Sequence, residues 1–273
     1  MAFSVITSVY KNDQPEFVRI ALESISAFQA SRPSEIVLVV DGPIPEALSS
    51  VIVDLESNYA GLFKVIWLKE NRGLGNALRL GVENASNELI ARMDSDDISM
   101  RDRFSQQLAY LEAHPDVSIV GGQITEFIDQ PSNVVGRREV PLSHEDIMAY
   151  MKHRCPMNHV SVMFRKSDVQ RVGGYLDWPW NEDYYLWVRM GAGGCKFANL
   201  PDILVNVRVG NEMYARRGGW PYFKSERGIQ RLMLQNKMIS LPRYLVNVTL
   251  RFCLQVLMPN YLRGWVFRTF ARK

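Results

Sequence analysis

The chain of 273 residues has few cysteines, and their spacing is not that of metal ligands or of a disulfide framework. Cys155, Cys195 and Cys253 lie far apart, and no C-x-x-C pair occurs. This pattern argues against a disulfide scaffold and a zinc ribbon. The start of the chain, MAFSVITSVY, also lacks the basic segment and the long apolar run of a signal peptide. Together these absences predict a cytoplasmic protein with reduced thiols.

Histidine is scarce as well, with four residues and no H-E-x-x-H spacing. His153, Cys155 and His159 are near neighbours in the sequence, but a chance grouping explains them better than a zinc site. Histidine thus offers no indication of zinc chemistry.

Negative charge is missing from the C-terminal part of the chain. All 29 acidic residues lie at or before Glu226, and the 47 residues after it carry nine basic side chains. The net charge is therefore −6 up to Glu226 and +9 beyond it, although the whole chain has a formal charge of only +3. We divide the chain accordingly into a globular domain, residues 1–225, and a basic amphipathic helical tail, residues 226–273.

The tail has no apolar run long enough to span a membrane. Its most apolar stretch, LPRYLVNVTLRFCLQVLMP, contains Arg251, and the segment between Pro242 and Pro259 is shorter than the roughly 20 residues that a bilayer requires. Two interpretations are open. The tail is either an interfacial helix, extended by YLRGWVFRTFARK, on an anionic membrane surface, or a helix docked on the core with a solvated basic face.

Unopposed positive charge beside aromatic residues favours the membrane surface over water alone. This interpretation predicts a peripheral protein on the inner face of the cytoplasmic membrane. Nucleic acid is disfavoured as a partner, because the acidic part of the chain would repel phosphates.

Short β-branched runs alternate with helical patterns in the N-terminal part of the chain. Segments with helical spacing, such as 15–28 and 73–85, separate runs with the length and composition of buried strands, at 3–9, 35–40, 62–68 and 88–93. This alternation predicts an α/β fold with a doubly wound, mostly parallel sheet and helices on both faces.

Ligands of such sheets bind beyond the carboxyl ends of the strands. Four loops are expected to meet there, and they carry Ser8 and Tyr10, Asp41 and Gly42, Asn71, Arg72 and Gly73, and Asp94 to Asp97. Taken alone, Tyr10 could be a half-buried loop aromatic, and Asp41-Gly42-Pro43 could be an ordinary turn. Their common position makes them candidates for a binding site.

The loop before the second predicted helix, NRGLGNALRLG, is only a partial match to a phosphate-binding loop, because Leu78 replaces the third glycine of G-x-G-x-x-G. Gly73 and Gly75 nevertheless open a helix whose amides could face an anion, and Arg72 and Arg79 are near in sequence. The segment is therefore a candidate for binding a diphosphate.

The aspartates of ARMDSDDIS are the strongest indication of a functional site in the sequence. Asp94, Asp96 and Asp97 share a small volume. Carboxylates at such short distances raise each other's pKa unless a cation lies between them. An EF-hand does not fit, since Ser99 and Ser105 occupy its glycine and glutamate positions. The sequence favours a two-carboxylate site that holds Mg²⁺ or Mn²⁺ against a diphosphate.

Two other metal-dependent classes fit less well. An aspartyl-nucleophile phosphatase prefers Thr or Val where Ile98 stands, and its motif usually follows the first strand. A nucleotidyltransferase would have a glycine-rich basic loop after the first strand, where this chain has SVYKNDQPEF.

An ordered set of motifs resembles the family 2 glycosyltransferases of GT-A fold, especially bacterial enzymes of capsule and exopolysaccharide assembly. The motifs extend from about residue 3 to about residue 220 and read SVITSVYKND, VVDGP, NRGLGNALRLG, ARMDSDDIS, NHVSVMFRKSDVQRVGGY and NEDYYLWVRM. The resemblance implies transfer of a sugar from a UDP- or GDP-sugar to a glycan or lipid-linked acceptor, usually with inversion. A metal-dependent phosphotransfer or phosphatase-type enzyme and an inactive nucleotide-sugar-binding subunit remain alternatives.

The resemblance also assigns roles on the donor side. Ser8, Tyr10 and Asp41 would hold the base and ribose, and Arg72 with Arg79 would neutralise the diphosphate. Asp94-Ser95-Asp96 matches the D-x-D motif. Asp96 would be the direct metal ligand, Asp94 would lie nearer the ribose or a metal-bound water, and Asp97 would instead cap the next turn.

On the acceptor side the resemblance assigns the catalytic base to Asp183, with Glu182 beside it. Trp180 would be a platform for the acceptor sugar, and His159 either lies near the acceptor or is a packed structural histidine. A further group of basic residues, Arg208, Arg216 and Arg217, would form a mobile lid over the diphosphate.

Overall fold

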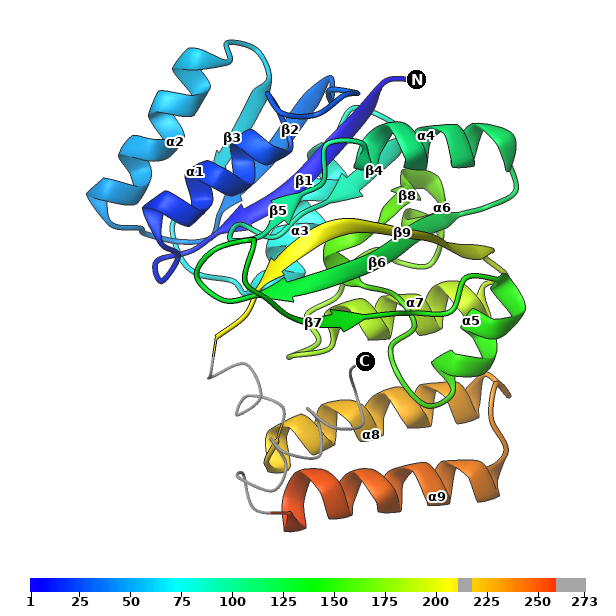
Figure 1. Cartoon of the computed structure of the whole chain (residues 1–273). Coiled ribbons are helices and arrows are strands. Elements are labelled where there is room, and N and C mark those ends of the chain that lie inside the picture. The colour runs from blue at the N-terminus through cyan, green and yellow to red at the C-terminus, as the bar shows by residue number, and fades with distance from the viewer. Residues whose placement is uncertain (211–217, 259–273) are drawn as a thin grey trace.

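The predicted strands form one half of a mixed sheet (Figure 1). The computed structural model describes residues 1–210 and 218–258, and within these ranges nine strands form one sheet in the order β3-β2-β1-β4-β8-β6-β9-β5, with β7 beside β6. Their bounds are β1 (Phe3–Val9), β2 (Glu35–Val40), β3 (Phe63–Trp67), β4 (Leu89–Arg92), β5 (Ile98–Ser99), β6 (Ile119–Phe127), β7 (Val134–Arg138), β8 (Met163–Arg165) and β9 (Phe197–Arg208).

The four N-terminal strands are parallel, as predicted. β1 and β2 have the bounds expected from the sequence, while β3 and β4 are slightly shorter than expected. Beyond β4 the sheet becomes mixed, because β8 runs antiparallel to both β4 and β6. The α/β class is thus confirmed, with the predicted parallel strands in the N-terminal half of a mixed sheet.

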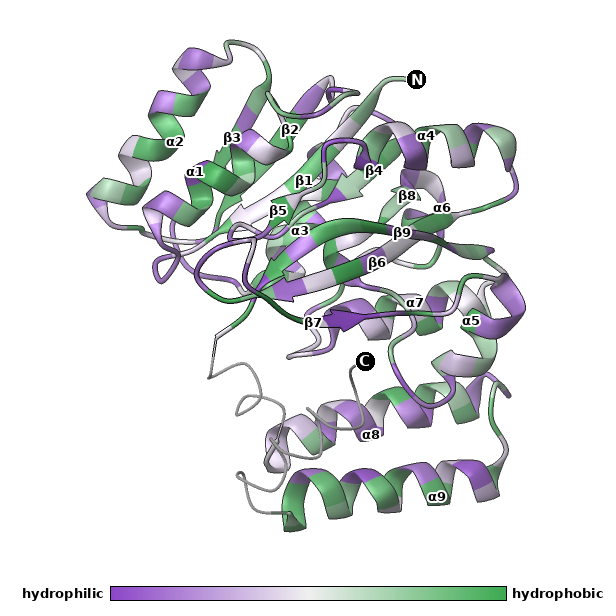
Figure 2. Ribbon diagram, viewed as in Figure 1, coloured by the Kyte–Doolittle hydropathy of each residue, from purple (hydrophilic) through white to green (hydrophobic). Residues whose placement is uncertain are grey.

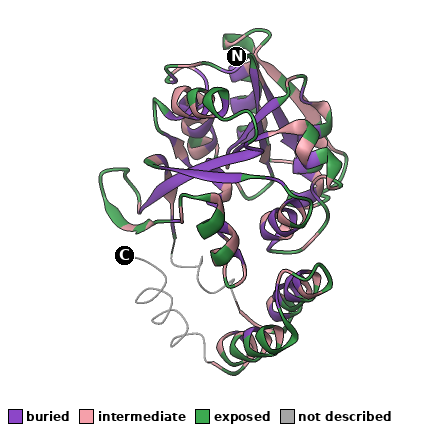
Figure 3. Ribbon diagram, turned by 90° about the vertical axis from the view of Figure 1, so that its right-hand side faces the viewer, coloured by how far each residue is buried: buried purple, intermediate pink, exposed green. Residues whose placement is uncertain are grey.

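Helices cover both faces of the sheet, since adjacent strand residues point to opposite sides. Val5 of β1 packs with α1, α2 and α4, whereas its neighbour Ile6 packs with α3, α7 and α8. Figure 3 shows the buried strands between these two layers. The bounds of the α-helices are α1 (Pro15–Ser24), α2 (Glu46–Asn58), α3 (Leu74–Asn84), α4 (Arg103–Ala113), α5 (His144–Met151), α6 (Lys166–Arg171), α7 (Glu182–Ala192), α8 (Trp220–Gln235) and α9 (Leu241–Phe252).

Two of the predicted helices are confirmed with changed ends. The one expected at 73–85 is α3, and the one expected at 15–28 is α1, which ends at Ser24. The carbonyl of Ser24 accepts a hydrogen bond from Gln29 Nε2 at 2.6 Å, so a side chain rather than the amide of a further helical turn satisfies it. The end of α1 is thus set by a glutamine outside the helix.

The C-terminal helices do not begin where the charge pattern suggested. The predicted boundary between residues 225 and 226 lies inside α8, whose Ile229 and Met233 belong to the same buried cluster as α7. Helix α8 thus packs with the core, and α9 lies against α8 on the far side (Figure 1). A short π-helical turn, η2 (Cys253–Leu257), follows α9. Among the described residues, no helix combines the length and the apolar character needed to cross a membrane.

Candidate active site

The carboxyl ends of β1, β2 and β4 lie side by side, so the structure brings the predicted loops to one edge. Val9 of β1 is in register with Val40 of β2, and the amide of Asp41 donates to the carbonyl of Val9 at 2.8 Å. On the other side of β1, the amide of Met93 donates to the carbonyl of Ile6 at 3.1 Å. Ser8, near the end of β1, is half-buried, and Tyr10 is exposed in the next loop.

The loop after β1 is tied directly to the aspartate loop through a residue that the sequence analysis missed. Asp13 Oδ2 accepts hydrogen bonds from the hydroxyl of Ser95 at 2.9 Å and from the amide of Tyr10 at 3.0 Å. Partial burial raises the pKa of Asp13, and the charge of Asp94 acts in the same direction. A fourth carboxylate thus stands beside the D-x-D motif. The only signal for it was its place in the loop after the first strand.

Asp94 is paired with a buried cation. Arg92, the last residue of β4, is 2% exposed, and its Nη2 lies 2.5 Å from Asp94 Oδ1. Arg92 is also within electrostatic range of Tyr175 and Glu182, so it lies between the aspartate loop and the start of α7. This ion pair fixes Asp94 against the sheet.

Asp96 and Asp97 have opposite environments. Asp96 is exposed at the tip of the loop, but restricted access of water to its carboxyl group and the charges of Asp94 and Asp13 raise its pKa to about 6. Asp97 is buried, and its Oδ1 accepts a hydrogen bond from the amide of Arg208 at 2.8 Å. Asp97 therefore ties the loop to β9, whereas it was expected to cap the next turn.

The loop suits a hard cation that completes its coordination with substrate oxygens. Within the part of the chain that the structure describes, no group of three or more His, Cys, Asp or Glu side chains is arranged to hold a metal ion by itself. Asp94 and Asp96 supply carboxylate oxygens, which Mg²⁺ and Mn²⁺ prefer. Burial and then the charges of Asp94 and Asp13 raise the pKa of Asp96, and a bound cation would favour its ionised form. The donor set thus fits a divalent cation that binds together with a diphosphate.

Asp41 organises the loop before α3. Its Oδ1 accepts from the amide of Arg72 at 2.7 Å, and its Oδ2 accepts from the amide of Gly73 at 3.0 Å and from Asn71 Nδ2 at 3.0 Å. Gly42 next to it has φ +90°, and a Cβ atom there would lie 2.6 Å from the amide nitrogen of Asn71. The two loops are therefore in close contact, and the amide of Gly73, which was expected to face a ligand anion, is taken by Asp41.

The two arginines predicted to face the diphosphate are both on the surface. Arg72 belongs to the Asp41 loop, with its guanidinium 3.5 Å from Glu70. Arg79 lies in the middle of α3 and is 4.0 Å from Glu83, one turn further along. The structure thus joins Arg72, but not Arg79, to the loop of Asp41.

The start of α7 carries the second acidic pair. Burial, followed by the charge of Asp183, raises the pKa of Glu182 to about 7. Asp183 Oδ1 accepts from the amide of Tyr184 at 2.6 Å, and its Oδ2 accepts from the thiol of Cys155 at 3.5 Å. A Cβ atom on Gly75 would lie 3.5 Å from Glu182 Cβ, so the first turns of α3 and α7 are in contact. Asp183 is half-buried and binds an amide of the first helical turn, which leaves both a capping and a chemical role open.

Helix α8 contacts the segment directly before this acidic pair. Asn181, the buried residue before Glu182, donates from Nδ2 to the hydroxyl of Ser225 at 3.0 Å. Ser225 in turn donates to the carbonyl of Pro179 at 2.7 Å. These residues are far apart in the sequence, and no sequence motif indicated that they would be in contact. The start of α7 is therefore held by the C-terminal helices.

The two aromatic candidates on the acceptor side differ. His159 Nε2 lies 2.8 Å from the hydroxyl of Tyr175, and burial, followed by the charge of Arg92, keeps the pKa of His159 well below its usual value. His159 is therefore a neutral, packed histidine, as the structural alternative predicted. Trp180 is 53% exposed, adopts φ +63° and lies two residues before Glu182. Its position leaves the ring open to a ligand.

The expectation for Arg208 is wrong. Its guanidinium lies 3.7 Å from the ring centre of Phe17 and 4.7 Å from that of Phe127, and Nη1 donates to the carbonyl of Asp129 at 2.9 Å. Arg208 is thus fixed at the end of β9 rather than part of a mobile lid. The other two residues of the expected lid, Arg216 and Arg217, lie outside the described residues.

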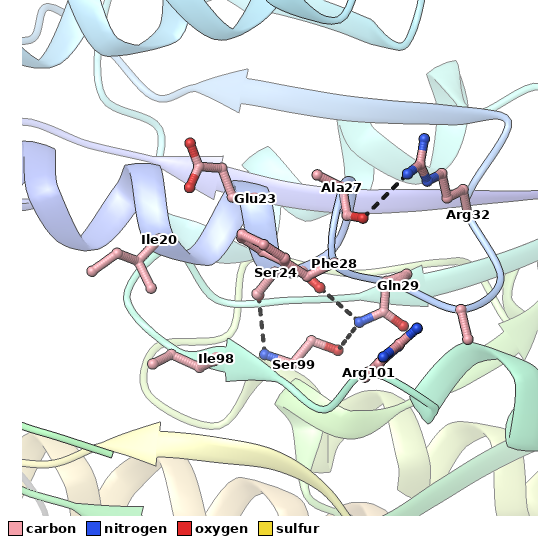
Figure 4. Close-up of a pocket in the computed structure, with 11 residues that line it drawn as sticks. Ile20, Glu23, Ser24, Ala27, Phe28, Gln29, Arg32, Ile98, Ser99 and Arg101 are labelled. Atoms are coloured by element: carbon pink, nitrogen blue, oxygen red, sulfur yellow. Dashed lines mark hydrogen bonds between the residues drawn. The ribbon is translucent and has the colours of Figure 1, made fainter. Parts of the chain in front are cut away.

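A groove of about 770 Å³ lies elsewhere, between α1 and β5 (Figure 4). Phe28, Arg32 and Arg101 are among its lining residues, and Ser24 accepts from the amide of Ser99 at 3.0 Å beside it. None of the site residues predicted from the sequence lines this groove.

The comparisons with known proteins agree with the site. A model of the glycosyl transferase family 2 matches residues 4–173, more than half of the chain. The chain is a family 2 glycosyltransferase. This membership confirms the resemblance seen in the sequence and excludes the phosphatase-type alternative.

Two relatives match this glycosyltransferase over most of its length. It is 40% identical over 237 residues to the amylovoran biosynthesis glycosyltransferase AmsE of Erwinia amylovora, with 86% of each chain covered. It is 35% identical over 271 residues to the UDP-Gal:alpha-D-GlcNAc-diphosphoundecaprenol beta-1,3-galactosyltransferase of Escherichia coli, with 99% of this chain and 97% of that one covered.

The fold of this glycosyltransferase is also found among solved structures. A crystal structure of S. aureus TarS 1-349 in complex with UDP-GlcNAc superposes with a TM-score of 0.70 at 18% identity and covers 98% of this chain and 75% of TarS 1-349. At this identity the likeness concerns the fold alone.

Proposed function

We propose that this glycosyltransferase transfers a sugar, with inversion at the anomeric carbon, from a UDP- or GDP-sugar to a lipid-linked or other glycan acceptor in surface polysaccharide assembly. The observation that carries the proposal is the convergence of two acidic groups. Asp94 and Asp96 follow β4, Glu182 and Asp183 begin α7, and the buried Arg92 lies within electrostatic range of both groups. The names of the two relatives, one for amylovoran and one for a diphosphoundecaprenol acceptor, support this substrate class.

On the donor side, the loops around Asp41 would bind the nucleoside. Ser8 and Tyr10 stand at the end of the neighbouring strand and would complete this pocket. Arg72, from the loop that Asp41 organises, would approach the diphosphate. Arg79 is the weaker candidate, because it points to Glu83 within α3.

Asp96 and Asp94 would hold Mg²⁺ or Mn²⁺, which when bound offsets the negative charge of the departing diphosphate. Arg92 holds Asp94 in place through their ion pair. Asp13 holds the loop through Ser95.

On the acceptor side, Asp183 would accept the proton of the attacking hydroxyl. A sugar hydroxyl has a pKa far above 7 and attacks poorly unless its proton is removed as the new bond forms. Glu182 is the less suitable neighbour, because its pKa of about 7 leaves much of it protonated at neutral pH. Attack on the face opposite the diphosphate in one step would invert the anomeric centre.

A donor screen tests this function directly. UDP- and GDP-sugars would be incubated with a polyprenyl-diphosphate-linked sugar and Mn²⁺, and products would be detected by mass spectrometry. One donor should give a glycosylated acceptor. Absence of product with every donor, together with measurable nucleotide binding, would instead support the inactive nucleotide-sugar-binding subunit.

The dependence of donor binding on pH should reflect the ionisation of Asp96 in the aspartate loop. The pKa of Asp96 is raised to about 6, so its carboxyl group is ionised at pH 7 and protonated at pH 5. Because a proton competes with the cation for this group, the Mn²⁺-dependent affinity for UDP-galactose should be about tenfold weaker at pH 5 than at pH 7. Calorimetry at the two pH values measures this, and Asp96→Asn should abolish the difference. Equal affinities at both pH values in the parent chain would contradict the assignment.

The C-terminal part would hold the enzyme on the membrane that carries its acceptor. Nine basic residues and no acidic residue follow Glu226 in the sequence. This excess of positive charge suits binding to an anionic surface. Attraction of this kind is screened by salt, so binding to phosphatidylglycerol vesicles should weaken several-fold when salt is raised from about 0.05 M to about 0.5 M. Vesicle flotation would show it, and salt-independent binding would argue against the proposal.

A further inference from the structure

The polarity of α9 is reversed relative to an ordinary surface helix. A helix at a protein surface normally buries apolar residues and exposes polar ones. In α9 the only fully buried residue is Asn247, and in η2 it is Gln255. The side of this segment that faces the protein therefore carries buried polar residues, beside Phe252, whose ring packs against Phe223 of α8.

Polar contacts attach that side to the rest of the enzyme. Asn247 Nδ2 donates to the carbonyl of Lys152 at 2.9 Å and to Gln230 Oε1 at 2.7 Å. Arg251 lies 2.5 Å from Glu226 in an ion pair whose two side chains are nearly buried, and it also donates to the carbonyl of His153. These bonds fix which side of the helix points away from the protein.

The outward side carries a row of large apolar residues at helical spacing. Each of them is between 51% and 63% exposed, a fraction unusual for so many neighbouring aliphatic side chains. We call this row the outer stripe, and it consists of Leu241, Leu245, Val246, Leu250 and Leu257. Figure 2 shows the apolar character of α9, and Figure 3 shows exposed residues over this outer helix.

The charges around the outer stripe have one sign. Among the described residues from 220 to 258, the only acidic side chain is Glu226, which Arg251 neutralises. The exposed charged residues of this region are all basic: Lys224, Arg227, Arg231, Lys237 and Arg243. The outer stripe is thus an apolar surface in positively charged surroundings.

We propose that the outer stripe lies in the interface of an anionic lipid bilayer, with the basic residues of α8 and α9 at the level of the headgroups. This inference rests on the proposed function and extends it, because it names the surface that contacts the membrane and so orients the site. Helix α8 lies between the outer stripe and Asn181, which it holds through Ser225 directly before Glu182 and Asp183. Helix α8 thus links the outer stripe to the start of α7, which carries the proposed base.

The same observations speak against a second copy of the chain as the occupant. Two outer stripes in contact would bring the basic residues of both copies together without an exposed acid to pair with them. Anionic lipid supplies the missing negative charge, and its acyl chains accept the leucines. An anionic bilayer thus complements both the apolar outer stripe and the basic residues around it.

The test is a full-length variant with Leu245→Glu and Leu250→Glu, compared with Val53→Glu, an equally exposed apolar residue on α2. Flotation uses vesicles of phosphatidylcholine with and without phosphatidylglycerol. The stripe variant should bind the anionic vesicles at least about tenfold more weakly than the parent chain, while Val53→Glu binds as the parent does. Light scattering of parent and variants measures self-association.

Activity on a water-soluble acceptor separates this inference from the proposed function. The stripe variant should turn over that acceptor at the parent rate, and it should lose activity only on acceptor embedded in vesicles. If the stripe variant binds vesicles as tightly as the parent chain does, the inference is wrong. The membrane contact would then lie in another part of the chain, for example residues 259–273. A parent dimer that the stripe variant abolishes would also overturn it in favour of contact between copies.

Discussion

Replacing Asp183 by asparagine should leave donor binding intact and lower the rate of sugar transfer by about 10² to 10⁴, the usual contribution of a general base. Asparagine keeps the shape of the side chain and can still accept from the amide of Tyr184 through Oδ1. Its amide cannot take a proton at neutral pH, so the acceptor hydroxyl would attack without assistance. Single-turnover rates with a saturating donor would measure the loss, and calorimetry with UDP would measure binding.

The alternative is that Asp183 only caps α7, for which asparagine serves about as well. In that case Asp183→Asn would transfer sugar at nearly the parent rate, and the base would have to be sought elsewhere. Glu182→Gln is the matched control, because it alters the adjacent carboxyl group in the same helical turn. We expect it to retain most activity. A loss confined to Glu182→Gln would exchange the roles of the two residues.

The part of the fold that sequence patterns predict well is the parallel half of the sheet. β1 and β2 are buried on both faces and rich in β-branched residues, and each has its expected bounds. β8 has only three residues and β5 only two, and runs that short carry no period. The turn from a parallel to a mixed sheet could not be predicted for this reason.

The site was predictable in its loops but not in its long-range contacts. Asp94 and Asp96 follow a strand that the sequence makes plain, and their place at the sheet edge follows from the topology. Arg208 looked like part of a mobile basic segment, because the sequence does not reveal that Phe17 and Phe127 enclose it. The bond between Asn181 and Ser225 joins residues 44 positions apart and has no local signature.

The C-terminal helix has features of both interpretations that the sequence left open. Arg251 was a reason to doubt a membrane span, and in the structure it pairs with Glu226 and docks α9 on the protein. The apolar residues of the same stretch point outward instead of into the core. Composition reveals the apolar and basic character of this segment, but only tertiary contacts decide which side faces solvent.

Replacing Asp96 by alanine should remove the effect of Mn²⁺ on nucleotide binding and at least about 10² of the activity. A bound cation stabilises the departing diphosphate by several kcal/mol, which corresponds to at least that factor in rate. In the parent chain UDP should bind more tightly with Mn²⁺ than without it, and in Asp96→Ala the two affinities should become equal. Calorimetry with and without Mn²⁺ measures both values.

Two other aspartates of the same segment provide the controls for this experiment. Asp102 is exposed and makes no side-chain cap on α4, so Asp102→Ala should behave as the parent chain in binding and turnover. Asp97→Ala should act differently from both. It leaves the half-buried amide of Arg208 without its acceptor, which should cost about 1 to 3 kcal/mol of stability and lower the melting temperature, while the effect of Mn²⁺ on UDP binding persists. If instead Asp96→Ala kept its dependence on Mn²⁺ and Asp97→Ala lost it, the cation would be held from within the loop, and the roles assigned to these two carboxylates would have to be reversed.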